Sequence, residues 1–298
     1  MINYRSKIRI LILGEEYHAK AFYEQLKNYE TGIFEPKYIA SIKEHSDYGN
    51  FDLFHLISTP LPVIRKLSKF KKPIFYHWIG TDVYRFINDN FIMKYFKKLT
   101  INSGKVQNLV VSQNLKIELQ KLNIDSMVLP LTKLNFNVDI MADNKKLSVL
   151  SYVPKNRWDF YHGETILELA SRLPEIDFHI LAAGEKNIKK PNVFFYDFID
   201  DVTPFYQKCS VLIRLTIHDG LPKMVLEALF HGLQVIWNEQ FPFCHQASNI
   251  NDCLSILKKL ESNCPVNLEG RKFIKETFSE SKLLGDYTQM CNEILGRN

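Results

Sequence analysis

The stretch VLIRLTIHDGLPKMVLEALFHGLQVI, residues 211–236, predicts one complete repeat of an α/β fold. A short apolar run (211–216) has the composition of a buried strand, and an irregular loop containing Asp219 and Gly220 follows it. Residues 224–232 have the apolar spacing of a helix and end in glycine, which commonly closes helices. Residues 234–238 then form the next apolar run. This order is typical of a parallel sheet covered by helices.

The same alternation extends over the whole chain and restarts once. Strands are predicted in the first half at 8–13, 51–58, 73–79, 108–112 and 126–131, and in the second half at 146–153, 177–184, 192–199, 211–216 and 234–238. Helices are predicted between them, for example at 19–27, 62–70, 164–174 and 203–209. Continuous apolar runs suit parallel strands that are buried on both faces. Residues 132–143 are polar without periodicity, and we interpret them as the connection between two domains.

We therefore predict an α/β fold of two Rossmann-like domains that face each other across a cleft. The first domain spans 1–135 and the second spans 146–275, and the amphipathic segment 276–298 forms a C-terminal helix. Doubly wound sheets bind ligands beyond the carboxyl ends of their strands, so the loops at these ends are the expected binding site.

Composition excludes several classes of protein. Hydrophobic residues make up 46% of the 298 residues, which is enough for sizeable cores, and no apolar run reaches the roughly 20 residues of a membrane-spanning helix. The N-terminal apolar run is followed at once by Glu15 and Glu16, unlike a signal peptide, so a cytoplasmic protein is expected. The five cysteines form no CxxC pair, which argues against disulfides and thiolate zinc sites.

The positive charge lies in the first half. Residues 1–135 contain 20 Lys and Arg and 12 Asp and Glu, a net charge of +8, whereas the remainder contains 18 and 21, a net charge of −3. Basic residues cluster at 65–72, and again at 94–98 among aromatic residues. Such a surface suits peripheral contact with an anionic membrane, and it equally suits an ordinary solvated face. Nucleic acid is not expected, because no recognition motif accompanies the basic residues.

The loop and helix at 214–227 have the chemistry of an anion site. Proline at 222 favours the first helical turn, which leaves the amides of Lys223 and Met224 able to point at a phosphate at the positive end of the helix dipole. Glu227 follows one turn later, where a carboxylate can accept hydrogen bonds from ribose hydroxyls. Arg214 precedes the loop, either as a donor-binding cation or as a structural charge.

Asp219-x7-Glu227 resembles the EX7E signature of retaining GT-B glycosyltransferases of family 4. The usual pattern, similar to EGFGLPxLEAxxxG, is matched at Gly220, Glu227, Ala228 and Gly232, and Leu221 and Pro222 lie in the donor-binding loop that it implies. This chain departs from it by having Asp219 in place of the first glutamate. The resemblance implies that Asp219 lies near the donor sugar, that Glu227 holds the nucleotide ribose, and that segment 276–298 returns to the first domain.

A second match lies after the strand at 146–153. Relatives have an arginine there and a Lys–Gly pair five residues later, and this chain has Arg157 followed by His162–Gly163. Arg157 offers a permanently charged fork for a diphosphate, whereas His162 is a cation only when protonated, and Lys155 is expected to add the missing charge. The resemblance also places Phe198 and Ile199 at the base pocket, although we expect a core role for both side chains.

The acceptor side is expected in the first domain. His77, Gly80 and Asp82 resemble an H-x(2)-G-x-D pattern of many relatives, which implies that His77 and Asp82 face the cleft as catalytic groups. Gly80 allows close backbone approach. Gly14 and Glu15, after the first strand, form the loop expected nearest the acceptor. Ser112 is expected to cap the following helix, with contact to the cleft as the alternative.

The resemblance implies a hexosyltransferase that moves a sugar, with retention, from a UDP- or GDP-linked donor to a glycan or lipid-linked acceptor in the synthesis of cell-surface polysaccharide or glycoconjugate. No DxD motif is present, since Asp200 and Asp201 are adjacent, so no metal and no cofactor are expected. Two rivals stay open, a sugar-nucleotide 2-epimerase and a non-catalytic nucleotide-binding partner in a glycan-assembly complex. The sugar, the base, the acceptor, the linkage and the oligomeric state do not follow from the sequence.

Overall fold

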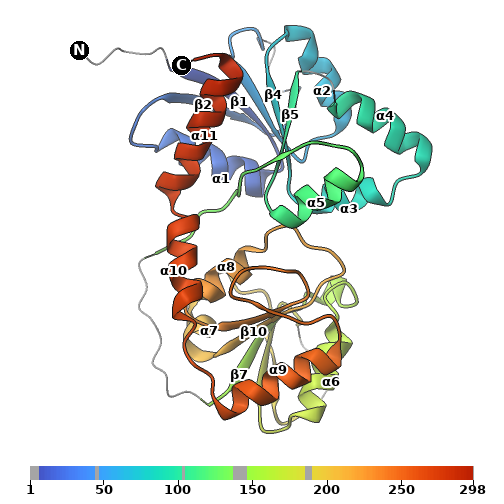
Figure 1. Ribbon diagram of the computed structural model, residues 1–298, viewed down its shortest axis with the longest axis vertical. Helices are drawn as coiled ribbons and strands as arrows, with labels where there is room; N and C mark the ends of the chain where they lie inside the picture. The colour runs from blue at the N-terminus through green and yellow to red at the C-terminus, as the bar shows by residue number, and fades with distance from the viewer. Residues whose placement is uncertain (1–6, 44–46, 103–104, 137–145, 185–189, 298) are drawn as a thin grey trace. The chain divides into compact units, whose positions relative to one another are not determined.

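The structure is a computed structural model that describes residues 7–43, 47–102, 105–136, 146–184 and 190–297 (Figure 1). The chain divides into two compact units. Unit 1 consists of Met1–Leu134 together with Phe278–Asn298, and unit 2 consists of Asn135–Thr277. Most of the connection predicted at 132–143 lies outside the described residues.

Unit 1 contains a six-stranded parallel sheet of order β2-β1-β3-β4-β5-β6. Its strands are β1 (Ile8–Gly14), β2 (Phe34–Ile39), β3 (Leu53–Ile57), β4 (Ile74–Trp78), β5 (Val106–Val110) and β6 (Met127–Val128). Its helices are α1 (Glu16–Lys27), α2 (Leu61–Leu67), α3 (Thr81–Ile87), α4 (Phe91–Ile101) and α5 (Gln113–Lys121), and a 3-10 turn, Ser68–Phe70, follows α2. The edge strand β2 was not predicted, because its sequence FEPKYI contains a proline and alternates exposed with half-buried residues.

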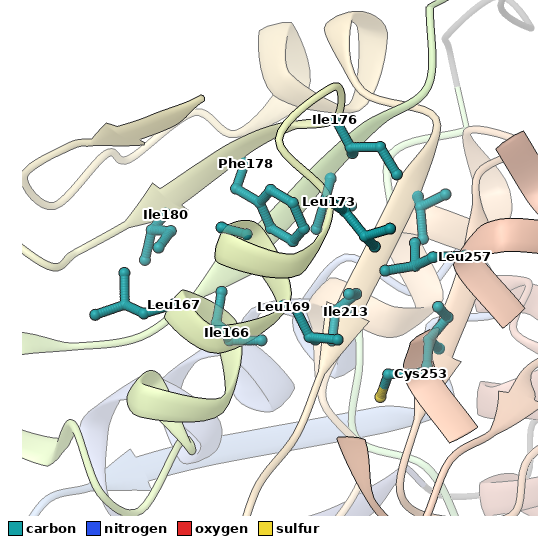
Figure 2. Packing of buried hydrophobic residues seen from close by; sticks show 14 of the residues in the cluster. Ile166, Leu167, Leu169, Leu173, Ile176, Phe178, Ile180, Ile213, Cys253 and Leu257 are labelled. Atoms are coloured by element: carbon teal, nitrogen blue, oxygen red, sulfur yellow. The ribbon is translucent and has the colours of Figure 1, made fainter. Parts of the chain in front are cut away.

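Unit 2 repeats the plan with a sheet of order β12-β11-β10-β7-β8-β9. Its strands are β7 (Ser148–Tyr152), β8 (Asp177–Leu181), β9 (Val193–Phe195), β10 (Val211–Arg214), β11 (Gln234–Trp237) and β12 (His245–Gln246). Its helices are α6 (Gly163–Arg172), α7 (Thr203–Lys208), α8 (Lys223–Phe230), α9 (Ile250–Ser262) and α10 (Leu268–Thr277), with a 3-10 turn at Lys155–Arg157. In the core of this unit, Leu169 of α6, Ile213 of β10 and Leu257 of α9 lie in one apolar cluster (Figure 2).

The C-terminal helix α11 (Glu280–Leu295) belongs to unit 1. Its buried residues Leu284, Tyr287 and Cys291 lie in the same apolar cluster as strands β1 and β3. Burial of this kind is the main stabilising contribution to such a helix, because a short helix is marginal in water by itself. No helix among the described residues is long and apolar enough to span a membrane.

Candidate functional site

In unit 2, the loops that follow β7 and β10 meet at the carboxyl ends of these neighbouring strands. The amide of Ile217 donates to the carbonyl of Phe160 at 3.0 Å, which ties the loop after β10 to the loop after β7. The two sequence motifs, 155–163 and 214–227, are therefore adjacent in space. This edge is where doubly wound sheets bind their ligands.

Asp219 is held by the buried side chain of Arg214. The Nε of Arg214 donates to Oδ2 of Asp219 at 2.8 Å, and its second guanidinium nitrogen lies 2.6 Å from the same oxygen. The other carboxylate oxygen accepts from the amide of Gly220 at 3.1 Å. Burial opposes the charge on Arg214, but Asp219 raises the pKa of this guanidinium further and keeps it charged. The structure thus gives Arg214 a structural partner within the loop, one of the two roles left open by the sequence.

Two arginines flank one aromatic ring at this edge. The guanidinium carbon of Arg157 lies 4.0 Å from the ring centre of Phe160 and 5.3 Å from that of Tyr161. The guanidinium carbon of Arg214 lies 4.8 Å from the Tyr161 ring. Cation–π contacts of this kind hold a guanidinium in place without using its hydrogen bonds. Arg157 is itself exposed and can offer its N–H groups to an anion.

The start of α6 is shaped by Gly163. A Cβ at this position would lie 2.1 Å from the ring of Trp158, so the close packing of ring on backbone requires glycine. His162 precedes it as the N-cap with φ 49°, a left-handed conformation that is uncommon for residues other than glycine. Lys155 lies exposed on the 3-10 turn that carries Arg157. Three potential cations thus lie within one short segment.

Helix α8 begins at Lys223, with Pro222 as its N-cap. The carbonyl of Pro222 accepts from the amide of Val225 at 3.0 Å, as expected of a first helical turn. Among the described residues, no hydrogen bond engages the amides of Lys223 and Met224. Both are available for an anion beside the loop of Gly220 and Leu221.

Glu227 makes two contacts on this helix. The hydroxyl of Tyr206 donates to its Oε2 at 3.0 Å, and Nζ of Lys223 lies 2.9 Å from its Oε1. Each carboxylate oxygen has two acceptor sites, so capacity for a further donor remains. Burial, together with Glu227, raises the pKa of Tyr206 well above its ordinary value, so this phenol stays a donor. Tyr206 was missed from the sequence because it lies on α7 and belongs to no motif.

Phe198 was expected in the core, and this expectation is wrong. Its side chain is 69% exposed in the segment between β9 and α7. The strand predicted at 192–199 is shorter in the structure and ends at Phe195, so Phe198 leaves the sheet. An exposed aromatic ring at this edge can stack on a planar ligand.

In unit 1, His77 was expected to face the cleft, but the structure buries its side chain. Strand β4 continues to Trp78 and is buried along its whole length, and His77 is 0% exposed. Its Nδ1 lies 3.1 Å from Nε2 of His55, and its Nε2 lies 2.8 Å from the carbonyl oxygen of Leu129. The second nitrogen of His55 lies 2.9 Å from the hydroxyl of Tyr287. Burial lowers the pKa of His77 to about 3, and burial also lowers that of His55, so both rings are neutral structural groups.

Asp82 lies in the first turn of α3, and its carboxylate accepts from backbone amides around the helix start. Its Oδ1 accepts from the amides of Ile79, Gly80 and Val83 at 3.1, 3.0 and 2.9 Å. Gly80 has a φ of 129°, a conformation that favours glycine, so the H-x(2)-G-x-D pattern here forms a helix start. Burial raises the pKa of Asp82 although these amides oppose the shift. Three backbone amides and the side chain of Ser58 thus bind this carboxylate.

Gly14 is the last residue of β1, and Glu15 follows it directly before α1. A Cβ at Gly14 would lie 2.3 Å from the carbonyl oxygen of Ile57, so glycine is needed for the close approach of β1 and β3. Glu15 is exposed at the N-cap position of α1. Ser112 caps α5 as predicted, since its hydroxyl accepts from the amide of Leu115 at 3.4 Å.

Unit 1 also contains a pocket of about 650 Å³ after β3 and β4. Its walls include the apolar side chains of Trp78, Phe86, Met93 and Phe96, and cations of three helices reach it, namely Arg65, Arg85 and Lys97. Asp82 lines it as well. The pocket was not predicted, because residues from α2, α3 and α4 form it without a common motif.

Metal ligands do not gather in the described part of the chain. No three His, Cys, Asp or Glu side chains there lie close enough together to hold a metal ion.

The sequence matches no protein-family model and no curated protein. Solved structures are similar in fold. HepE of Anabaena, in complex with UDP and glucose, has a TM-score of 0.71 at 10% identity and covers 96% of this chain and 100% of its own. Sucrose-phosphate synthase of Thermosynechococcus elongatus gives 0.74 at 10% identity over 99% and 100%. A glycosyltransferase of Rickettsia africae gives 0.73 at 13% identity over 99% and 100%. The chain has the GT-B fold, with two Rossmann-like units of six parallel strands each.

Proposed function

We propose that this protein is a retaining, metal-independent glycosyltransferase that moves a hexose from a UDP- or GDP-linked donor to a glycan or lipid-linked acceptor. The observation that carries the proposal is the joining of the two loops of unit 2, where Ile217 donates to Phe160. This bond brings the cations of one loop beside the acidic loop and helix start of the other. The similarity in fold to HepE, which was crystallised with UDP and glucose, supports it.

The leaving diphosphate gains most of the charge in such a reaction, so cations and amides aimed at it contribute most to the rate. Arg157, exposed and steadied on Phe160, supplies a fixed positive fork. Lys155 or protonated His162 adds a second charge, and the amides of Lys223 and Met224 bind the phosphates at the helix start.

Glu227 binds the ribose in this proposal. Tyr206 and Lys223 hold the carboxylate from two sides, which fixes its orientation and leaves acceptor sites for the ribose hydroxyls. The exposed ring of Phe198 stacks on the base.

Asp219 orients the donor sugar. Arg214 and the amide of Gly220 fix its carboxylate within the loop, so a sugar hydroxyl would meet an acceptor of set geometry. Retention follows a front-face route in which the departing phosphate takes the proton of the acceptor hydroxyl. No protein base is then needed, so this proposal gives no proton-transfer role to His77, whose ring is buried, or to Asp82, whose carboxylate accepts from backbone amides.

The pocket of unit 1 is the proposed acceptor site. Apolar walls combined with Arg65, Arg85 and Lys97 suit an acceptor that joins an apolar part to an anionic group. A lipid-linked phosphate has this chemistry. We place the enzyme in cell-surface polysaccharide or glycoconjugate synthesis, in the cytoplasm and peripheral to the inner face of the membrane.

One observation favours a second candidate, a non-catalytic nucleotide-binding partner. The pairing of Asp219 with buried Arg214 neutralises the residue expected nearest the sugar. Such a protein would bind the nucleotide and turn nothing over.

A thermal-shift screen with UDP, GDP and ADP sugars, followed by product analysis with and without acceptor, separates the possibilities. We expect one donor to raise the melting temperature, since a ligand at 100 times its Kd stabilises by about 2.7 kcal/mol. Glu227→Ala should abolish the shift, whereas Glu261→Ala on α9 should keep it. Product in the absence of acceptor would indicate an epimerase, binding without product a non-catalytic partner, and no shift with any donor would contradict the donor site.

A further inference from the structure

Helix α4 exposes an unusual share of the protein's apolar side chains. Fourteen large hydrophobic side chains are exposed in the described part of the chain, and six of them lie on this helix of 11 residues. The six are Phe91 (82%), Ile92 (65%), Met93 (45%), Tyr95 (55%), Phe96 (52%) and Leu99 (57%). Single exposed hydrophobic residues are ordinary, but a contiguous group of them indicates a binding surface.

The helix is nevertheless firmly anchored at its last turn. Thr100 and Ile101 are buried, and Nε of Arg65 on α2 donates to Oγ1 of Thr100 at 3.2 Å. The side chain of Asn90 caps the first turn through the amide of Met93 at 2.9 Å. Figure 1 shows α4 at the outer edge of unit 1, and the helix packs there against α2. A well-capped helix with this exposure is a preformed surface.

The charge around α4 has one sign. Residues 61–102 contain nine Lys and Arg but only two acidic residues. Both acids are engaged, since Asp82 accepts from backbone amides at the start of α3 and Asp89 pairs with Lys97. Among the described residues, no ion pair engages Lys94 or Lys98 on α4. The surface therefore combines exposed aromatic and aliphatic side chains with uncompensated positive charge.

We propose that α4, together with the cations beside it on α2 and the following turn, docks the protein on an anionic lipid bilayer. Aromatic and aliphatic side chains enter the headgroup region, and lysines contact anionic lipid at its surface. The charge decides against a second copy of the chain as the occupant, because a two-fold interface would oppose the same positive patch to itself.

The docking surface borders the acceptor pocket. Met93, Phe96 and Lys97 of α4 form part of the pocket wall. Docking through α4 therefore brings the pocket to the lipid surface, and a lipid-linked acceptor can enter it from the bilayer. This last step rests on the proposed function, whereas the docking itself does not.

Cosedimentation with vesicles tests the proposal. The full chain should bind vesicles of phosphatidylglycerol mixed with phosphatidylcholine and should bind pure phosphatidylcholine much more weakly. The double variant Phe91→Ser/Ile92→Ser, whose sites do not line the pocket, should lose binding at least tenfold. The matched control Ile117→Ser/Leu268→Ser removes exposed apolar side chains from α5 and α10 and should bind as the wild type does.

Two double lysine variants test the contribution of charge to vesicle binding. Lys94→Gln/Lys98→Gln should weaken binding on the order of 20-fold and reduce its salt dependence, whereas Lys258→Gln/Lys259→Gln on α9 should change little. Light scattering reports the oligomeric state. Binding by the α4 double variant equal to that of the wild type would overturn the proposal, as would a wild-type dimer that this variant converts to a monomer. Donor binding measured by calorimetry tests the transferase separately, because its failure would leave the vesicle result standing.

Discussion

The two units differ in the accessibility of the polar residues at the ends of their strands. In unit 2, the residues after β7 and β10 carry charge to an accessible edge, where Arg157 is exposed and Asp219 meets the loop. In unit 1, the comparable residues turn inward. His77 is closed between His55 and Leu129, and the carboxylate of Asp82 is used by its own helix. A titratable residue at a strand end is thus no evidence of catalysis until its partners are known.

The largest expected effect on turnover comes from removing Arg157, the exposed arginine at the strand ends of unit 2. Arg157→Ala should lower turnover by about 100- to 1,000-fold, since preorganised charge on a leaving group has this order of effect. Its guanidinium lies against two aromatic rings in an exposed loop, so thermal stability should change by no more than about 0.5 kcal/mol. Steady-state kinetics and a thermal melt measure the two quantities.

Arg172→Ala provides the matched control. This arginine is also exposed, but it is the last residue of α6 and pairs with Glu168 one turn earlier, away from the loop that carries Arg157. Its turnover should stay near that of the wild type. A melt that collapses in Arg157→Ala with turnover per folded molecule intact would make Arg157 structural, and the contrast between the units would disappear.

The opposite result is expected for the buried histidine of unit 1. His77→Ala removes a ring that hydrogen-bonds to His55 and Leu129, and it opens a cavity in the core. The expected cost is about 3 kcal/mol of the free energy of unfolding, measured by urea denaturation. Turnover per folded molecule, measured by steady-state kinetics with donor and acceptor, should not change. Lost turnover at full stability would restore His77 as a functional residue.

These contrasts also show what could be read from the sequence. Alternating apolar runs and the glycine after α8 predicted the two α/β arrays, because both are local features of the chain. The cap of Ser112 and the start of α8 beside Pro222 were predicted for the same reason.

The burial of His77 could not be predicted, because its surroundings come from distant parts of the chain. One ring nitrogen reaches His55 on β3, which in turn contacts Tyr287 on α11, 232 residues away. Tyr206 reaches Glu227 in a similar way from another helix. Spacing within a motif carries no information about such partners, whereas burial and hydrogen bonds in the fold decide the role.

The buried histidines of unit 1 predict a pH dependence of the free energy of unfolding, and His179 of unit 2, whose pKa burial lowers to about 4, adds to it in the same direction. The folded pKa of His77 is about 3, below its ordinary value near 6.5, so the unfolded chain binds the proton first as the pH falls. Stability is then unaffected above about pH 6.5 and declines below it, by about 2 kcal/mol at pH 5 for one such histidine. His55 acts in the same direction.

Urea denaturation between pH 7 and pH 5 measures this slope. His77→Phe should reduce this slope without abolishing it, because His55 and His179 keep their lowered pKa values. Equal slopes in the wild type and His77→Phe would show that the ring titrates normally in the folded state, and would contradict its complete burial.

The smallest effect is expected at the accessible edge of unit 2. Phe198 is exposed and packs into no core cluster of the described residues, so Phe198→Ala should leave stability within about 0.5 kcal/mol. If its ring stacks on the base, the substitution should weaken binding of the nucleoside diphosphate by about 1 kcal/mol, or roughly fivefold. Phe198→Tyr keeps the ring and should keep the affinity. Phe194→Ala, an exposed phenylalanine on β9 that stacks on His179, controls for the general loss of an aromatic side chain. Equal affinities of Phe198→Ala and the wild type would show that the base does not stack on this ring. The phosphate and ribose assignments would be unaffected, because they depend on Arg157 and Glu227.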